Sequence, residues 1–430
     1  MRIDRSVLAS VAWPSEWRTV PLWALFDRVK DVGHPQEELL SVYRELGVVK
    51  RAGRDDNFNK AAPDRNIYQL IDPGWLVVNR MKAWQGSVGI SPYRGIVSGH
   101  YICFRPRHRE ESRFLNWLLR SGIYATEFAS LSRGVRPGQV EIDNDLLRVL
   151  PVKLPAVDEQ RRIADFLDAE TARVDRIVEA RDAQRSTLRE RELALIYETL
   201  SGGASPENGR PTGMPWLPVV PKDWKVGPVY GYFTTELGKM LNAERAAGDR
   251  QRPYLRNANV HWYGIDTSDM ATMSFDVSEV RRYSVEPGDL LVCEGGAGVA
   301  EAAVWNGEIS ECYYQKSLHR VRQSGSVPVE WLMYWLRLAK HVGVFAADGN
   351  IATIPHLTGE QLREYRIPIP PDGDRRVAKL NREVHELMSA INRLDHAEAL
   401  LAERRQALIT AAVTGQLDVT TARPKHDRDF

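Results

Sequence analysis

The stretch LRERELALIYETLSG (188–202) recurs about 210 residues later as LAERRQALITAAVTG (401–415). The two stretches align without a gap and are identical at seven of their fifteen positions. Each ends in a glycine, the residue that favours the left-handed conformation just beyond a helix C-terminus. A match of this kind after a full domain indicates that the chain contains two copies of one unit.

Each copy closes a long charged segment that begins after a proline. The beginnings also agree, with LPAVDEQRRIA (154–164) matching IPPDGDRRVA (369–378) across one gap. Apolar residues in the second segment alternate in steps of three and four, as in a heptad repeat, and the first segment keeps a looser version. We predict two helices of about 40 residues, each about 60 Å long, that bury their seams against each other as an antiparallel coiled coil. The alternative is two unrelated surface helices. The seam of the second segment consists of Val377, Leu380, Val384, Leu387, Ile391 and Leu394.

The regions before the two helices are predicted to be mixed globular domains. PSEWRTVPLWALF (14–26) and PKDWKVGPVYGYF (221–233) share Pro, Trp, Pro and Phe at matching places. Amphipathic helices are expected at 111–131 and 328–346, with their Trp and Tyr residues in the core. Short β-branched or aromatic runs bounded by Gly and Pro predict strands at 74–81, 95–106, 288–295, 317–323 and 363–370.

The predicted fold class is therefore α+β, with a pseudo-twofold repeat. The expected boundaries are a first globular domain at 1–157, a central helix at 158–203, a second globular domain at 204–371, a C-terminal helix at 372–420 and a disordered tail at 421–430.

Composition limits the classes of protein that fit. Of the 430 residues, 43% are hydrophobic and 27% are charged, as in ordinary globular proteins. The sequence contains neither an apolar run of the roughly 18–20 residues that a membrane span needs nor a signal peptide. Three cysteines without CxxC spacing argue against a disulfide framework or a zinc site. They favour a reducing compartment, so we expect a cytoplasmic protein without a membrane partner.

Charge is balanced overall, at +1, but is distributed unevenly. Residues 60–140 carry twelve Lys/Arg and five Asp/Glu, a net charge of +7, whereas residues 266–311 carry ten acids and two arginines, a net of −8. If both halves bind one polyanion, the second half must place its basic residues outside the acidic stretch. The candidates just upstream are Lys239, Arg245, Arg250, Arg252 and Arg256.

Recognisable catalytic motifs are absent from the sequence. It has no GxxxxGK phosphate loop, dinucleotide fingerprint, GxSxG elbow or metal-binding His pair, and the glycines of EGGAGVAEA (294–302) have turn spacing. It also lacks the Asn-Pro-Pro-aromatic tetrad of amino-methyltransferases and an acidic-pair-plus-lysine nuclease motif. A duplicated chain of this kind is more consistent with binding than with catalysis.

Several of these stretches carry a family resemblance. PAVDEQRRIADFLDAE (155–170), with the helix that follows to Gly202, resembles the central conserved region of type I restriction–modification specificity subunits, and ERRQALITAAVTGQLDV (403–419) resembles their C-terminal conserved region. PGWLVVNRMKAWQGSVGISPYRGIVSGHYICFRP (73–106) is similar to one version of their target recognition domain. YLRNANV (254–260), PGDLLVCEG (287–295), YQKSLHRV (314–321) and ATIPHLTGEQLREYRIPIPP (352–371) are similar to another.

The resemblance implies a DNA specificity subunit that is not itself an enzyme. Its two target recognition domains would each contact half of a bipartite, asymmetric site in double-stranded DNA. Its helices would dock two methyltransferase subunits that use S-adenosylmethionine, and motor–nuclease restriction subunits that use ATP and Mg would join for cleavage. This chain itself would bind no cofactor or metal. It departs from the family where Glu159-Gln160 of the first copy is replaced by Gly373-Asp374, so the two docking surfaces are expected to differ if that pair seats a partner.

Arg, Lys, Asn and Gln on loops are the side chains that best contact bases and phosphates. Each also has a structural interpretation: an exposed Arg can be a solvated charge, Asn257 or Asn259 can cap a turn, His356 can pack in a loop and Trp84 can belong to the core. The candidates in the first domain are Arg80, Lys82, Trp84, Gln85, Arg94, Arg133, Arg136 and Gln139. Those in the second are Arg256, Asn257, Asn259, Gln315, Lys316, Asn350, Thr353 and His356.

Two other functions remain open on the sequence alone. A coiled-coil scaffold without DNA binding would explain the helices, although not two large duplicated domains. An enzyme with an unrecognised active site would show methyltransferase activity as a purified chain, whereas a specificity subunit would be inert without its partners.

Overall fold

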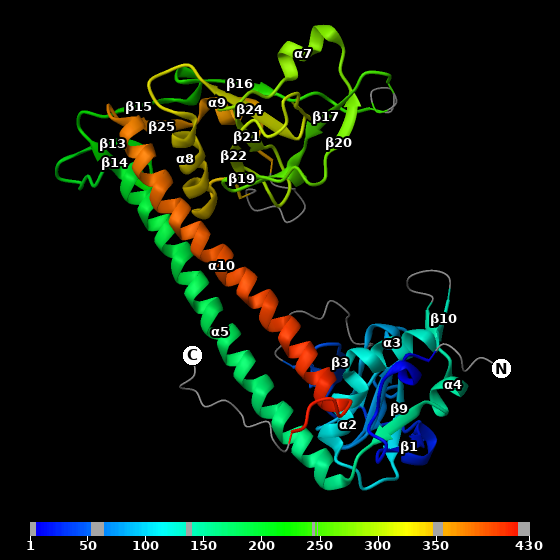
Figure 1. Cartoon of the computed structure of the whole chain (residues 1–430). Helices are drawn as coiled ribbons and strands as arrows, with labels where there is room; N and C mark the ends of the chain where they lie inside the picture. The colour runs from blue at the N-terminus through cyan, green and yellow to red at the C-terminus, as the bar shows by residue number, and fades with distance from the viewer. Residues whose placement is uncertain are drawn as a thin grey trace. The chain divides into compact units, whose positions relative to one another are not determined.

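The computed structural model describes residues 6–52, 64–134, 140–242, 246, 248–346 and 356–419. The chain divides into two compact units, which are described separately (Figure 1). The first unit contains residues 1–182 and 395–430, and the second contains residues 183–394. Each long helix therefore contributes one end to each unit.

An antiparallel four-stranded sheet, ordered β2-β9-β6-β7, forms the centre of the first unit. Leu76 and Val78 of β6 belong to the core under the helices, while Val77 between them belongs to a core on the other face. Because both faces are covered, the strand is a continuous apolar run rather than an alternating one. The strands are β2 (Phe26–Val29), β6 (Leu76–Asn79), β7 (Val88–Ile90) and β9 (Tyr101–Pro106).

The helix expected at 111–131 is two helices, α2 (Ser112–Arg120) and α3 (Gly122–Ser130). Ser121 between them is extended, with ψ of 154°, and its hydroxyl accepts a hydrogen bond from the backbone N–H of Tyr124. The serine is thus the C-cap of α2 and the N-cap of α3, which ends one helix and starts the next.

The predicted strand at 95–106 is also divided in two. β8 (Gly95–Val97) pairs with β5, whereas β9 joins the central sheet. The remaining elements of the first unit are η1 (Val7–Ser10), β1 (Arg18–Pro21), α1 (Leu22–Leu25), β3 (Leu40–Tyr43), β4 (Gly47–Lys50), β5 (Gln69–Ile71), η2 (Ala83–Gln85), β10 (Ser132–Arg133), β11 (Glu141–Ile142), α4 (Asn144–Arg148) and β12 (Pro151–Leu154).

The second unit repeats this topology. Its central antiparallel sheet is ordered β16-β24-β21-β22, and a separate strand pair, β15 with β25, matches the pair β1 with β12 in the first unit. The duplication inferred from the helix ends therefore extends through the strands of both domains. These strands are β15 (Lys225–Pro228), β16 (Phe233–Leu237), β21 (Leu290–Cys293), β22 (Ala302–Val304), β24 (Leu318–Gln323) and β25 (Arg366–Ile369).

The helix expected at 328–346 is α8 (Val329–His341), which ends before Gly343, a residue with φ of +82°. Trp331 and Trp335 on this helix are fully buried, as predicted for core residues. The other elements of the second unit are β13 (Gly209–Met214), β14 (Leu217–Pro221), η3 (Val229–Gly231), β17 (Gln251–Leu255), η4 (Asn257–Asn259), β18 (Val260–His261), β19 (Gly264–Ile265), β20 (Ala271–Ser274), α7 (Val277–Tyr283), β23 (Tyr313–Tyr314) and α9 (Gly359–Glu364).

The long helices are α5 (Val157–Ser201) and α10 (Gly373–Val413), which lie side by side in Figure 1. In each unit the beginning of one helix shares a core with the end of the other. This is antiparallel packing, and it confirms the predicted α+β fold with paired helices. The first unit's core contains Ile163, Ala164 and Leu167 of α5 with Ile409, Ala412 and Val413 of α10, and the second unit's contains Ile196 and Leu200 of α5 with Val377, Leu380 and Val384 of α10.

Cys103, Cys293 and Cys312 are all buried free thiols. Burial raises the pKa of each thiol to about 12, because a thiolate would lose its solvation there. Across the described ranges, none of the helices combines the length and the apolar character that crossing a membrane requires.

Candidate nucleic-acid interface

In the first unit, Arg80 lies directly after the end of β6 and beside the β10–β11 hairpin. Its carbonyl oxygen accepts a hydrogen bond of 3.1 Å from the backbone N–H of Ile142, and its Nε lies 3.0 Å from Oε1 of Glu141. Both contacts involve β11, so the hairpin fixes both the backbone and the guanidinium group of Arg80.

Arg133 lies on the opposite strand of the same hairpin. It is the register partner of Glu141, and its guanidinium group forms a 2.8 Å ion pair with Asp143 while remaining 74% exposed. Asp143 also accepts hydrogen bonds from the backbone N–H groups of Asp145 and Leu146, as the N-cap of α4. The hairpin therefore brings together the half-buried Arg80 and the exposed Arg133, each held by one carboxylate.

The next candidates follow Arg80 in the chain. Asn79 Oδ1 accepts hydrogen bonds from the backbone N–H groups of Met81 and Lys82, which starts the turn into η2. Lys82 and Gln85 are exposed, whereas Trp84 is half-buried and its Nε1 donates to the carbonyl of Met81. Lys82 and Gln85 thus add two exposed polar groups to these arginines. Arg136 and Gln139 lie outside the described residues.

Arg94 is in a different place. Its Nε lies 3.0 Å from Glu37 and its Nη1 lies 2.7 Å from Asp72, so two carboxylates hold it. The hydrogen bonds that its guanidinium group donates to the carboxylates of Asp72 and Glu37 raise the pKa of Arg94. Asp72 precedes β6 and Arg80 follows it, which puts the two arginine clusters at opposite ends of that strand.

In the second unit, Asn257 connects three segments at the start of η4. Its backbone N–H donates to Ser317 Oγ (3.2 Å), and its Nδ2 donates to the carbonyl of Gly295 (2.8 Å). Its Oδ1 is buried and has no hydrogen-bond partner among the described residues. A hollow of about 470 Å³ lies beside it, lined also by His261, Glu301 and the glycine-rich turn 295–298.

The neighbours of Asn257 have different roles. Asn259 is buried: its Oδ1 accepts from the backbone N–H of Arg256, and its Nδ2 donates to the carbonyls of Asp266 and Asp269. Its amide therefore caps η4, which is the structural alternative recognised from sequence. The guanidinium group of Arg256 reaches the surface, where Nη2 lies 2.6 Å from the carboxylate of Asp269.

Three further candidates border the same region. Gln315 donates its backbone N–H to the carbonyl of Leu255 (2.9 Å), and Lys316 next to it is exposed. His356 forms a backbone bridge with Gly295, and its Nε2 lies 3.4 Å from Glu294. The structure thus brings Asn257, Gln315, Lys316 and His356 together, although they are up to 99 positions apart in the sequence. Asn350 and Thr353 lie outside the described residues.

The basic residues expected upstream in the second unit only partly supply this surface. Lys239 is 2% exposed, donates to the carbonyl of Ser274 and forms an ion pair with Glu279, so its assignment to a basic surface was wrong. Arg252 is exposed but is paired with Glu311 at 2.9 Å. Arg245 lies outside the described residues.

Sequence reasoning missed the acidic partners of these arginines. These partners belong to no recognisable sequence motif. Each contacts its arginine only because a hairpin or a turn folds back: Glu141 contacts Arg80, Asp143 contacts Arg133 and Asp269 contacts Arg256. Among the residues that the structure describes, no cluster of three or more His, Cys, Asp or Glu side chains could hold a metal ion.

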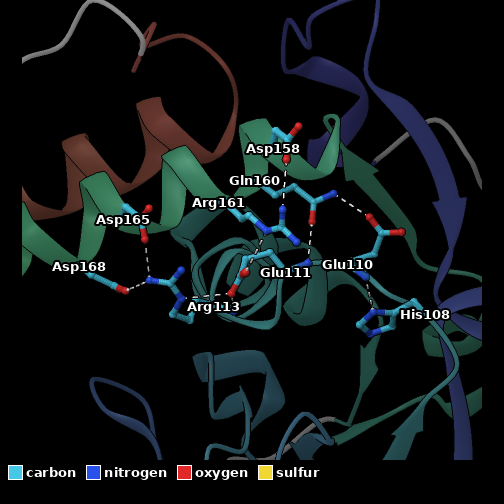
Figure 2. A network of polar contacts seen from close by, with 9 residues as sticks. All are labelled: His108, Glu110, Glu111, Arg113, Asp158, Gln160, Arg161, Asp165 and Asp168. Carbon is cyan, nitrogen blue, oxygen red and sulfur yellow. Dashed lines mark hydrogen bonds and ion pairs between the residues drawn. The ribbon is translucent and has the colours of Figure 1, made fainter.

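Gln160, half of the Glu-Gln pair noted in the sequence, lies inside a polar network where the first domain meets α5 (Figure 2). It is fully buried; its Oε1 accepts from the backbone N–H of Glu111 (3.0 Å), and its Nε2 donates to Glu110 (2.7 Å) and to the carbonyl of Pro155 (3.0 Å). We call this network the first junction. Gln160 is therefore an internal connection between domain and helix, which does not leave its side chain free to seat a partner.

Arg113 adds a second connection within the first junction. Its Nη1 contacts both Asp165 (2.8 Å) and Asp168 (2.9 Å) on α5, and its Nε contacts Glu111 (3.1 Å) (Figure 2). These carboxylates raise the pKa of Arg113, the contact with Asp165 contributing most. Burial by itself would raise the pKa of Glu110, but hydrogen bonds from Arg18 and Gln160 outweigh it and lower that pKa.

The corresponding place in the second unit, the second junction, is built without a buried amide. A Cβ on Gly373 would lie 3.0 Å from Val327 Cγ1, so the missing side chain allows close backbone packing. Arg376 lies 2.7 Å from Asp372 and stacks over Trp224 at 4.7 Å. The sequence difference at Gly373 thus corresponds to a different way of attaching domain to helix.

Comparisons with known proteins agree with these observations. Residues 45–184 match the family described as the type I restriction modification DNA specificity domain. The type I restriction enzyme EcoKI specificity subunit of Escherichia coli strain K12 is 23% identical over 298 residues, covering 65% of this chain and 61% of that protein. The EcoBI specificity subunit of Escherichia coli is 26% identical over 157 residues, covering 34% of this chain and 29% of that protein.

The fold is shared with a solved chain from a type I R-M system whose complex assembly and conformational transition have been described. That chain is 18% identical, with a TM-score of 0.67, and the match covers 94% of this chain and all of the other. The match to the EcoKI subunit spans about three fifths of that subunit's length. Residues 45–184 carry the type I restriction modification DNA specificity domain, and the chain is similar to type I restriction–modification specificity subunits.

Proposed function

We propose that this chain is the DNA specificity subunit of a type I restriction–modification complex, and that each unit recognises one half of a bipartite, asymmetric site in double-stranded DNA. One observation carries the proposal. The equivalent strands β6 and β21 are each followed by a cluster of polar side chains, and the two clusters differ in composition. Equivalent positions with different side chains are what recognition of two unlike half-sites requires.

The first cluster is cationic, with Arg80, Lys82 and Arg133 beside Gln85. Guanidinium groups suit guanine and phosphate, so this cluster is proposed to combine base and backbone contacts. The carboxylates of Glu141 and Asp143 hold the arginines in extended positions before DNA arrives. When DNA binds, the arginines would leave these carboxylates for DNA groups. Breaking the ion pairs would cost little free energy, because exposed ion pairs contribute only about 0–1 kcal/mol.

The second cluster is mainly uncharged. Asn257 lines the hollow next to the glycine-rich turn, and His356 forms a backbone bridge with Gly295 of that turn. Gln315, Lys316 and Arg256 lie on the adjoining segments. The Oδ1 of Asn257 has no hydrogen-bond partner among the described residues, and an asparagine amide that turns toward DNA can pair with adenine through two hydrogen bonds. Asn259 is excluded from this cluster by its role in η4, and Arg94 by its distance along β6.

The paired helices are proposed to set the separation of the half-sites and to dock two methyltransferase subunits. Half-sites contacted from one face of B-DNA lie about 34 Å apart, and helices of about 60 Å are long enough to span that separation. Catalysis is assigned to the partners: S-adenosylmethionine to the methyltransferases, and ATP and Mg to motor–nuclease subunits, in a cytoplasmic complex.

The test uses the chain with its methyltransferase partners. The purified chain alone is expected to be inert, and site-specific methylation is expected to appear when the partners are added. Insertion of one helical turn into both α5 and α10 is expected to lengthen the spacer between the methylated half-sites. Methylation by the isolated chain would contradict the proposal, and an unchanged spacer would contradict the role assigned to the helices.

A further inference from the structure

Arg120 in the first unit and Arg337 in the second occupy equivalent positions. RFLNWLLR (113–120) on α2 and EWLMYWLR (330–337) on α8 align without a gap and share two leucines and the final arginine. Both leucines are fully buried in each copy. The two arginines therefore leave matching helices at the same place, and their surroundings can be compared directly.

In the second unit the arginine meets a buried carboxylate from α5. Arg337 Nε and Nη2 contact the two carboxylate oxygens of Glu192 at 2.8 and 2.9 Å, and Glu192 is 1% exposed. The hydroxyl of Tyr263 donates a further hydrogen bond to this carboxylate. The two hydrogen bonds from Arg337 and the one from Tyr263 thus compensate the buried charge of the Glu192 carboxylate.

In the first unit no carboxylate occupies that place. The gapless match of 188–202 with 401–415 puts Arg405 where the second unit has Glu192, so a second guanidinium group faces Arg120. Arg120 Nη2 donates to the carbonyls of Arg44 (3.2 Å) and Glu45 (2.5 Å), but its buried Nε has no hydrogen-bond partner in the described part of the chain. Burial lowers the pKa of Arg120 to about 10. The negative charge of Glu45 opposes this shift, and the positive charge of Arg405 adds to it by a smaller amount.

These arginines line a cavity of about 60 Å³. Arg44, Arg120 and Arg405 contribute three positive charges to its wall, and Glu45 contributes one negative charge. Arg405 is held from the other side by Asp175 at 2.7 Å. A polar cavity of this size holds several waters or one small oxyanion, and its charge favours the latter.

We propose that this cavity, the arginine pocket, binds a phosphate group at the place that the Glu192 carboxylate occupies in the second unit. Guanidinium groups offer planar, paired donors that match phosphate oxygens, and the three guanidinium groups of the pocket outnumber the two carboxylates beside them, Glu45 and Asp175. The binding of a phosphate group does not depend on the proposed function, whereas the assignment of that phosphate to DNA rests on it. The phosphate can be free in solution, or it can belong to a DNA strand, since Gly86 of the pocket directly follows Gln85 of the proposed interface.

The first experiment measures the thermal unfolding of the full chain as inorganic phosphate is titrated at constant ionic strength. The midpoint of the wild type is expected to rise with the logarithm of phosphate concentration above Kd. Arg405→Glu supplies the missing carboxylate, so its midpoint is expected to be independent of phosphate. The Arg405→Glu, Asp175→Asn double variant removes the repulsion from Asp175 and is expected to behave in the same way. Equal phosphate responses in wild type and Arg405→Glu, or no response in either, would overturn the proposal.

Arg405→Gln is the matched control. Like Arg405→Glu, it removes the guanidinium group and its ion pair with Asp175, but it does not supply a carboxylate. In phosphate-free buffer the Arg405→Glu, Asp175→Asn double variant is expected to unfold at a higher temperature than Arg405→Gln, because only the double variant supplies a carboxylate to Arg120. DNA binding then distinguishes the source of the phosphate. A shallower salt dependence in Arg405→Glu would identify a DNA phosphate, and an unchanged salt dependence with a lost phosphate response would identify free phosphate.

Discussion

The first and second units share a strand order but attach to the long helices by different contacts. The first unit uses the buried amide of Gln160 and the exposed pairs of Arg113, whereas the second uses close packing at Gly373 and the buried pair of Glu192 with Arg337. The frame is therefore duplicated at the level of topology, while the polar contacts are particular to each copy. This difference teaches that a repeat can retain its fold while its two copies acquire separate electrostatic environments.

The largest expected effect concerns the buried ion pair of the second unit. Glu192→Ala should destabilise that unit by about 3–5 kcal/mol, because it leaves the partly buried guanidinium group of Arg337 without its carboxylate. Denaturant unfolding would measure the loss. The Glu192→Met, Arg337→Met double variant is the control and should recover most of the stability. A loss below about 1 kcal/mol in the single variant would contradict the role assigned to this pair.

A smaller loss is expected at the first junction. Gln160→Ala removes three hydrogen bonds from a buried site and should cost about 1–3 kcal/mol, since the groups that it leaves are partly desolvated. Hydrogen exchange at the backbone N–H of Glu111 should accelerate. Asp158→Ala, at an exposed position on the same helix turn, is the matched control and should change stability by less than about 0.5 kcal/mol.

The two clusters can be compared by their effects on DNA binding in the complex. Arg80→Ala or Arg256→Ala should weaken sequence-specific binding by about 1–3 kcal/mol if the side chain contacts a base, and should mainly reduce the salt dependence if it contacts phosphate. Competition titrations at several salt concentrations would separate the two. Arg94→Ala serves as the comparison, because its two carboxylate partners give it a structural role. Equal effects of all three variants would argue against the clusters as defined.

The smallest expected effect is a pH dependence at both junctions. The folded-state pKa of Glu110 and of Asp372 is lowered, so each carboxylate adds stability that is present above its unfolded-state pKa of about 4 and is lost as the pH falls through the lower, folded-state value. Glu110→Gln and Asp372→Asn should each reduce the difference in unfolding free energy between pH 7 and pH 3. An unchanged difference in one variant would show that its junction does not contribute to acid sensitivity.

The sequence was sufficient for the paired helices and most central strands, because both follow from local periodicity. The prediction of one helix at 111–131 failed at Ser121, where a side-chain cap outweighs the amphipathic pattern. The prediction of one strand at 95–106 failed because this apolar run forms two strands that belong to different sheets. Residue type put Arg80 and Asn257 among the candidates for the interface, and their contact with DNA stays a prediction. The burial of Asn259 and Lys239 was not predictable, because burial and pairing depend on contacts from distant segments.

The contrast between Arg405 and Glu192 was present in the aligned helix ends, yet its meaning needed the structure. Only the packing of α2 and α8 shows that each of these positions faces an arginine. A charge reversal inside an otherwise similar repeat is thus a signal that sequence comparison can find and that structure can interpret.

The three buried thiols have a practical consequence for spectroscopy. With pKa values of about 12 they are almost entirely protonated at neutral pH and should react slowly with maleimides. A single cysteine introduced at an exposed site in each unit away from the two clusters, such as Glu16 and Asp223, would accept a fluorophore or spin label selectively in the otherwise native chain. Distances between such labels, with and without DNA, would measure the separation of the two units.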